Sequence, residues 1–172
     1  MITDDSQMII SQCIFSDIEI IGFGGNLLRF ESNTQPTLSS VIAAITECQF
    51  TDINTQGDNE QRGGSAIYAE IGDQGQLSII GPSEFINCVC NGGNAGALFA
   101  QLDSTGLLII DGSVLFKECN SMVNSDNGGR GGSLYLDFTE DSTYNFSIGY
   151  QRYDISLSFI VRKRFFDLWE NQ

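Results

Sequence analysis

The sequence predicts an all-β fold, a right-handed parallel β-helix (solenoid) of about four coils, from three observations. An aromatic residue that ends an apolar strand recurs at intervals of 31 to 37 residues. Each aromatic is followed, after a loop, by a strand that opens with small residues. The 172 residues include 19 glycines and only two prolines, which suits the tight corners that every coil must turn.

The repeat has a constant half and a variable half. The small-residue strands lie at 24–28, 63–68, 96–99 and 131–135, and the aromatic anchors are Phe15, Phe50, Phe85, Phe116 and Tyr153. The next anchor follows Ile67 and Leu98 by 18 residues and Leu134 by 19, with 23 in the first copy. The connection from an anchor to the next small-residue strand varies from 12 to 18 residues. The constant half is therefore predicted to be scaffold, and the variable half to carry loops.

The repeated segments read as strands. Residues 66–71 and 77–81 are short, partly alternating, rich in isoleucine and aromatics, and bounded by Gly, Asp, Asn and Ser. They lack the i, i+3, i+4, i+7 pattern of helical repeats and the Leu-x-x-Leu-x-Leu run of leucine-rich repeats. An antiparallel β-sandwich is the alternative. In a parallel β-helix the anchors should point inward and stack as one column, with Ile67, Leu98 and Leu134 in the same core.

One stretch of the repeat resembles a known family. Residues Gly63-Gly64-Ser65-Ala66-Ile67-Tyr68-Ala69, followed by Phe85-Ile86-Asn87-Cys88, are similar to the repeats of the polymorphic outer membrane protein family, with their Gly-Gly-Ala-Ile and Phe-x-x-Asn signatures. The resemblance covers about residues 10 to 156 and implies a β-helical, secreted or surface-displayed region involved in adhesion. At the position of the family's asparagine, this chain has Ile18, Ile53, Cys88, Cys119 and Ser156.

The charge and composition of the chain limit the classes of partner that it can bind. The net charge is −14, and residues 1–150 hold 19 acidic and 4 basic residues, whereas residues 151–172 hold 3 and 4. Such an acidic surface repels phosphate backbones and anionic lipids, so neither nucleic-acid binding nor direct membrane insertion is expected. The start shows no signal-peptide pattern and no stretch is long enough to span a membrane, so we expect a longer parent protein.

The cysteines fall into two columns of the repeat. Cys13 and Cys48 each precede an anchor by two residues, and Cys88 and Cys119 each follow one by three. In-register stacking separates such pairs by about 4.8 Å, within reach of a disulfide. They are either disulfides between coils or stacked, buried thiols, and buried thiols are favoured because other copies place Ile, Ser or Val there.

No catalytic, cofactor or metal site is predicted. The chain has no histidine, which excludes Ser-His-Asp and Cys-His catalysis. Asp17, Asp52, Asn87 and Glu118 each follow an anchor by two residues, forming an outward ladder without a basic partner. Such a ladder suits a solvated stripe better than an acid and base pair.

The sequence thus predicts a β-helical region over residues 1–157 and a C-terminal cap or tail over residues 158–172. The expected function is a non-catalytic, adhesive or structural role at the cell surface or outside the cell, with an unknown protein or glycan as partner. Binding is expected in the variable loops, chiefly 55–62 and 120–130, because a rigid coil tolerates loops of free length. The alternative is a polysaccharide-active or sugar-binding β-helix of the pectate lyase-like type, which would need carboxylates and an aromatic platform converging in one groove.

Overall fold

The computed structural model describes residues 6–32, 41–58, 60, 62–72, 74–103, 105–122, 132–138, 146–148, 152–154 and 159–163. Within these residues the chain forms strands and turns and no helix. The strands pair in parallel with equivalent strands of the next coil. The all-β parallel β-helix predicted from the repeat is confirmed.

Three sheets build the solenoid, each taking one strand or a pair of strands from every coil. Sheet A consists of β1 (Ser6–Ser11), β4 (Val41–Thr46), β7 (Gln76–Ile80), β11 (Leu107–Asp111) and β15 (Phe146–Ile148). Sheet B consists of β2 (Ile14–Phe23), β5 (Gln49–Gln56), β8 (Ser83–Ile86), β9 (Val89–Asn91), β12 (Val114–Lys117), β13 (Asn120–Met122) and β16 (Arg152–Asp154). Sheet C consists of β3 (Leu28–Glu31), β6 (Ile67–Ile71), β10 (Leu98–Leu102), β14 (Leu134–Phe138) and β17 (Phe159–Lys163).

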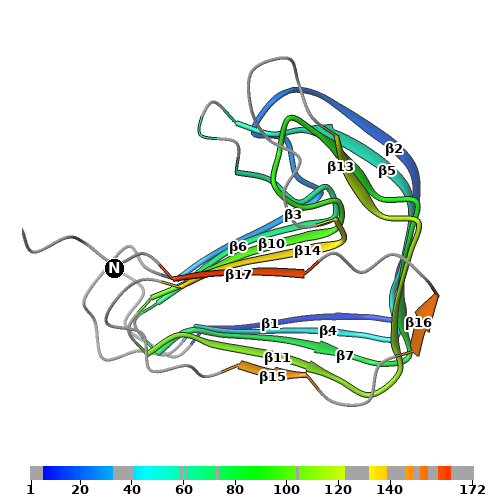
Figure 1. The fold of residues 1–172 in the computed structure, drawn as a ribbon. Coiled ribbons are helices and arrows are strands. Elements are labelled where there is room, and N and C mark those ends of the chain that lie inside the picture. The colour runs from blue at the N-terminus through cyan, green and yellow to red at the C-terminus, as the bar shows by residue number, and fades with distance from the viewer. Residues whose placement is uncertain are drawn as a thin grey trace, which may run out of the picture.

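Sheets A and C face each other across the bore, and sheet B closes one side (Figure 1). Sheet B then bends, so that β13 and the far ends of β2 and β5 lie beyond the outer face of sheet C (Figure 1). The strand β17 pairs in parallel with β14 and extends sheet C.

The bore is filled by columns of like side chains. Rings of Phe15, Phe50, Phe85 and Phe116 stack at centroid distances of 5.0, 4.7 and 4.8 Å in turn. Phe50 and Phe85 are fully buried, whereas Phe15 in the first coil is half-buried. The register places Tyr153 opposite Phe116, but the side chain of Tyr153 lies outside the described residues. On sheet C, the core residues Ile67, Leu98 and Leu134 are partners in one column.

Residues with left-handed backbone lie at two corners that recur along the solenoid. The first lies between sheets A and B and includes Gln12 and Glu47, with φ of 55° and 54°. The second lies within sheet B, at Asp17, Asp52, Asn87 and Glu118, with φ between 50° and 56°. Asn and Asp adopt this conformation more readily than most residues, which accounts for three of the four residues at the second corner.

Two glycines of the small-residue strands allow close approach between backbones. A Cβ on Gly64 would lie 2.4 Å from the backbone nitrogen of Phe99, and one on Gly96 would lie 2.4 Å from that of Asn120. Neither glycine has a left-handed backbone. Glycine is needed at these two positions because the backbones of neighbouring segments leave no room for a side chain.

Candidate functional site

The outer face of sheet C carries two columns of large polar and aromatic side chains. Alternation along each strand points every second residue away from the bore, and the parallel register aligns these residues between coils. One column holds Arg29, Tyr68, Phe99 and Tyr135, and the next holds Glu31, Glu70, Gln101 and Asp137. The aromatic and acidic residues therefore lie side by side on this face.

The aromatic column is a second, smaller core. Tyr68 and Phe99 stack at 5.2 Å, and Phe99 and Tyr135 at 5.4 Å, with planes within 9° of parallel. The three rings are each at most 2% exposed and pack with Ala95. The guanidinium of Arg29 covers the ring of Tyr68, with its central carbon 4.3 Å from the centroid. Because their faces are already covered, these rings offer no open platform for a sugar.

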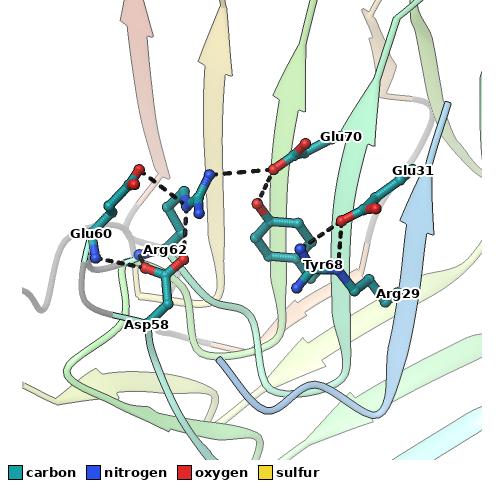
Figure 2. Close-up of polar contacts among 7 residues, drawn as sticks. All are labelled: Arg29, Glu31, Asp58, Glu60, Arg62, Tyr68 and Glu70. Atoms are coloured by element: carbon teal, nitrogen blue, oxygen red, sulfur yellow. Dashed lines mark hydrogen bonds and ion pairs between the residues drawn. The ribbon is translucent and has the colours of Figure 1, made fainter. Parts of the chain in front are cut away.

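Arg62 is the centre of a polar cluster beside this column (Figure 2). Its Nε lies 2.8 Å from Asp58 Oδ2 and 3.5 Å from Glu60 Oε2, and its Nη1 lies 3.4 Å from Glu70 Oε1. The hydroxyl of Tyr68 donates a hydrogen bond to the same Glu70 oxygen. The guanidinium of Arg62 thus joins the loop of residues 57–62 to sheet C.

The loop itself is held by an Asp58 turn. Asp58 Oδ1 accepts hydrogen bonds from the backbone N–H of Glu60 at 2.9 Å and of Arg62 at 2.8 Å. The backbone N–H of Asp58 in turn donates to the carbonyl of Arg62 at 3.0 Å. Side-chain acceptors of this kind replace a backbone turn and fix the loop conformation.

Exposure within this loop is uneven. The side chain of Glu60 is 73% exposed, whereas those of Asp58 and Arg62 are 23% and 30% exposed. Gly57 is buried. The sequence-based expectation of an exposed loop therefore applies to its tip and not to its base. The second expected loop, residues 120–130, begins with the strand β13 (Asn120–Met122), and residues 123–130 lie outside the described residues.

The electrostatics of the cluster shift the pKa values of Tyr68 and Arg62. Burial, the hydrogen bond to Glu70 and the charge of Glu70 together raise the pKa of Tyr68. Burial lowers the pKa of Arg62, but the hydrogen bond to Asp58 and the neighbouring acidic charges outweigh it and leave a raised pKa. Tyr68 therefore stays neutral and Arg62 charged, so neither provides a base or a nucleophile near neutral pH.

The four cysteines of the two columns are free thiols at the corners of the coils. Each follows a residue with left-handed backbone, namely Gln12, Glu47, Asn87 and Glu118. The Cys48 and Cys119 thiols donate to the carbonyls two residues earlier, at 3.2 Å to Thr46 and 3.4 Å to Lys117.

The thiols also contact the coil before them. The sulfur of Cys88 lies 3.6 Å from the carbonyl oxygen of Phe50, and the sulfur of Cys119 lies 3.3 Å from that of Phe85. A hydrogen bond with Cys119 and burial raise the pKa of Cys88. Cys48, Cys88 and Cys119 are buried and Cys13 is half-buried, so these thiols have a structural role at the corners of the coils.

The acidic ladder of the second corner is exposed, as its register predicts. Asp17, Asp52, Asn87 and Glu118 all face solvent. Asn87 Nδ2 donates to Asp52 Oδ1 at 2.5 Å, which separates the acidic charges of successive coils. Ile155, the next position of the ladder, lies outside the described residues.

A shallow hollow of about 260 Å³ lies at the first corner, lined by Gln12, Ile14, Glu47, Gln49, Pro82 and Glu84. Its lining contains two carboxylates and no basic or aromatic side chain. In the described part of the chain, no group of three or more Cys, Asp or Glu side chains is arranged to hold a metal ion. None of the described segments is a helix long and apolar enough to cross a bilayer.

In comparisons with known proteins, no protein-family model, curated protein or solved structure matches the chain. The candidate site must therefore be judged from its own geometry. The cluster around Arg62 is the place where carboxylates, cations and an aromatic hydroxyl meet (Figure 2).

This cluster was not predicted from the sequence, although one signal for it was present. Alternation in Ile67–Ile71 places Tyr68 and Glu70 on the face opposite to Ile67, Ala69 and Ile71. A tyrosine and a glutamate on the outer face should have indicated a polar partner there. The position of Arg62 depends on the fold of an irregular loop, which periodicity does not predict.

Proposed function

We propose that this chain is a non-catalytic β-helical segment of a cell-surface or secreted protein, with an adhesive or structural role. The observation that carries the proposal is the arginine-centred cluster that fixes loop 57–62 against sheet C. The cluster supports a rigid scaffold that presents a loop whose length can vary without disturbing the coil. This arrangement is expected of a binding surface.

The charge balance of the cluster favours binding over catalysis. Asp58 and Glu70 both contact Arg62, and Glu31 pairs with Arg29 at 2.5 Å. A general acid or base needs access to a substrate, whereas each of these carboxylates is held in an ion pair with an arginine. Glu60 is the most exposed charge of the cluster and the best candidate for a direct contact.

The partner would be a protein or glycan at a surface. The net charge of −14 disfavours nucleic acid and anionic lipid, and it favours partners with basic or neutral surfaces. No cofactor enters this proposal.

The test is binding to a panel of immobilised glycans and matrix proteins, with Glu60→Arg against a matched variant, Glu118→Arg. Both glutamates are strongly exposed, at 73% and 69%, but Glu118 lies on the corner ladder away from the loop. We expect Glu60→Arg to weaken capture by at least about tenfold and Glu118→Arg to leave it unchanged. Equal effects of the two variants would show that general acidity, and not the loop, drives capture.

A carbohydrate-active enzyme is the second candidate, and one observation favours it. The carboxylates of Asp58, Glu60 and Glu70 all contact Arg62, and the carboxylate of Glu70 also accepts the hydrogen bond of Tyr68 (Figure 2). Against it stand the covered ring faces of the aromatic column and the arginine at the centre of the acids. An assay for glycan cleavage separates the two candidates.

A further inference from the structure

The first coil of the solenoid presents three strand edges in one direction. Among the described strands, β1 pairs only with β4, β2 only with β5, and β3 only with β6. The remaining backbone donors and acceptors on this side form a template for a further layer of parallel strands.

The inward-facing apolar residues of the first coil are exposed on this same side. Met8, Ile10, Phe15, Ile18 and Leu28 belong to inward columns of the first coil, yet each is partly or largely exposed. Their partners in the second coil, Ala43, Ile45, Phe50, Ile53 and Ile67, are at most 2% exposed. Among the described residues, four of the five exposed large apolar side chains lie on β1 and β2: Met8, Ile9, Ile14 and Ile21. In the part of the chain that the structure describes, the apolar columns of the core are therefore uncovered at the first coil.

The last coil matches this cross-section column by column. Following the register from strand to strand leads from Ile10 to Ile148 on β15, from Phe15 to Tyr153 on β16, and from Leu28 to Phe159 on β17. The residue types at both ends of these columns are apolar or aromatic. A coil that continues the solenoid at its open end would need this pattern.

One outer column has opposite charges at its two ends. The register of sheet C leads from Glu31 on β3 to Arg162 on β17. The chain as a whole has the same asymmetry, since residues 1–150 are strongly acidic and residues 151–172 hold four basic and three acidic residues. If a last coil stacked on a first coil in the existing register, Arg162 would lie next to Glu31.

We propose that the open end of the first coil docks the last coil of a second copy of this chain. The contact is head to tail, parallel and in register, so that β15, β16 and β17 of one copy add to β1, β2 and β3 of the next. Because the two surfaces differ, each added copy leaves a free end of each kind, and the assembly grows into linear filaments. The inter-copy contact repeats the packing between coils within the chain.

Charge reversal tests this contact in the full chain. Sedimentation velocity over a concentration series should show the unaltered chain forming species larger than a dimer. Glu31→Arg and Arg162→Glu should each weaken association by at least about tenfold, because each places like charges in contact. Glu118→Arg, on the side of the solenoid, should leave association unchanged.

A mixture of the two charge variants distinguishes a head-to-tail contact from a contact between two first coils. In an equimolar mixture, the unaltered Arg162 of the Glu31→Arg protein would contact the unaltered Glu31 of the Arg162→Glu protein. At the next contact along the filament, the two substituted positions would meet, again with opposite charges. Alternating copies should therefore recover the association. A contact between two first coils predicts no such recovery.

Several outcomes overturn the proposal. They are a chain that stays monomeric throughout the series, growth that stops at the dimer, an Arg162→Glu variant that associates normally, and a mixture that does not recover. Circular dichroism checks that each variant keeps its strand content. If Glu31→Arg does not fold, Ile9→Lys adds a charge to a 62% exposed position of β1 and should lower association in the same way.

Discussion

The rings of Phe50 and Phe85 lie 4.7 Å apart and within 1° of parallel, although 35 residues separate them in the sequence. Both side chains are fully buried. This stacking of equivalent residues on successive coils is the contact that the repeat specifies. The stability of the solenoid should therefore depend on its internal anchors more than on its terminal ones.

Replacing Phe85 with Ala should lower the free energy of unfolding by about 3 to 5 kcal/mol, because the change opens a cavity between two neighbouring rings. Phe15→Ala serves as the matched variant and should cost less, since Phe15 is half-buried and stacks on one ring only. Urea titration measures both. A loss of less than about 1 kcal/mol for Phe85→Ala would place this ring outside the core.

Relieving the left-handed backbone at Glu118 should stabilise the protein. Glu118 has φ of 56°, which glycine adopts without steric cost. We expect Glu118→Gly to raise the free energy of unfolding by about 0.5 to 1 kcal/mol, after the greater chain entropy of glycine in the unfolded state is included. Lys117→Gly, one residue earlier in β12, should instead destabilise by a similar amount. Destabilisation by both changes would contradict the assigned backbone.

The raised pKa of Tyr68 predicts a loss of stability in alkali. A tyrosine in the unfolded chain has a pKa of about 10, whereas Tyr68 in the folded chain keeps its proton to higher pH. The contribution is complete below pH 10 and is lost as pH rises toward the folded pKa, at about 1.4 kcal/mol per pH unit.

Tyr68→Phe should remove this part of the pH dependence while the remaining tyrosines and cysteines titrate as before. Chemical unfolding at intervals between pH 8 and 11 measures the difference between the two proteins. Parallel profiles for the two proteins would show that the phenol is not held by Glu70.

Removing the central cation should release the loop. Arg62→Met keeps the aliphatic length but leaves Asp58 and Glu70 without this partner, so we expect faster amide exchange over residues 57–62. Buried ion-pair partners left behind cost about 1 to 3 kcal/mol of stability. Arg29→Met, at a residue that is 48% exposed, should have an effect within about 0.5 kcal/mol. Unchanged exchange in the Arg62→Met protein would contradict the proposed anchoring.

The period of the sequence was sufficient to predict the scaffold. In a parallel coil, spacing along the chain becomes register between strands, so the anchors at Phe15, Phe50, Phe85 and Phe116 could be assigned to one column. Positive φ at Glu47 and Glu118 could not be predicted in this way, because glutamate has no local preference for that backbone and the surrounding coil imposes it.

The candidate site was harder to predict than the scaffold. Tyr68 and Glu70 follow from strand alternation, but Arg62 lies in a loop whose path depends on the Asp58 turn. The cysteines show a similar limit. Their columns follow from spacing, whereas the contacts of Cys88 and Cys119 with the preceding coil follow from the corner geometry.

The central claim, that the chain binds without catalysis, is tested most directly by a reducing-sugar assay on polyuronides and neutral glycans, with and without calcium. The account predicts no release of reducing ends above the buffer rate, because its exposed carboxylates form a ladder and its clustered ones pair with arginine. Turnover that disappears in Glu70→Gln, Asp52→Asn or Glu118→Gln would contradict the account and establish the enzyme.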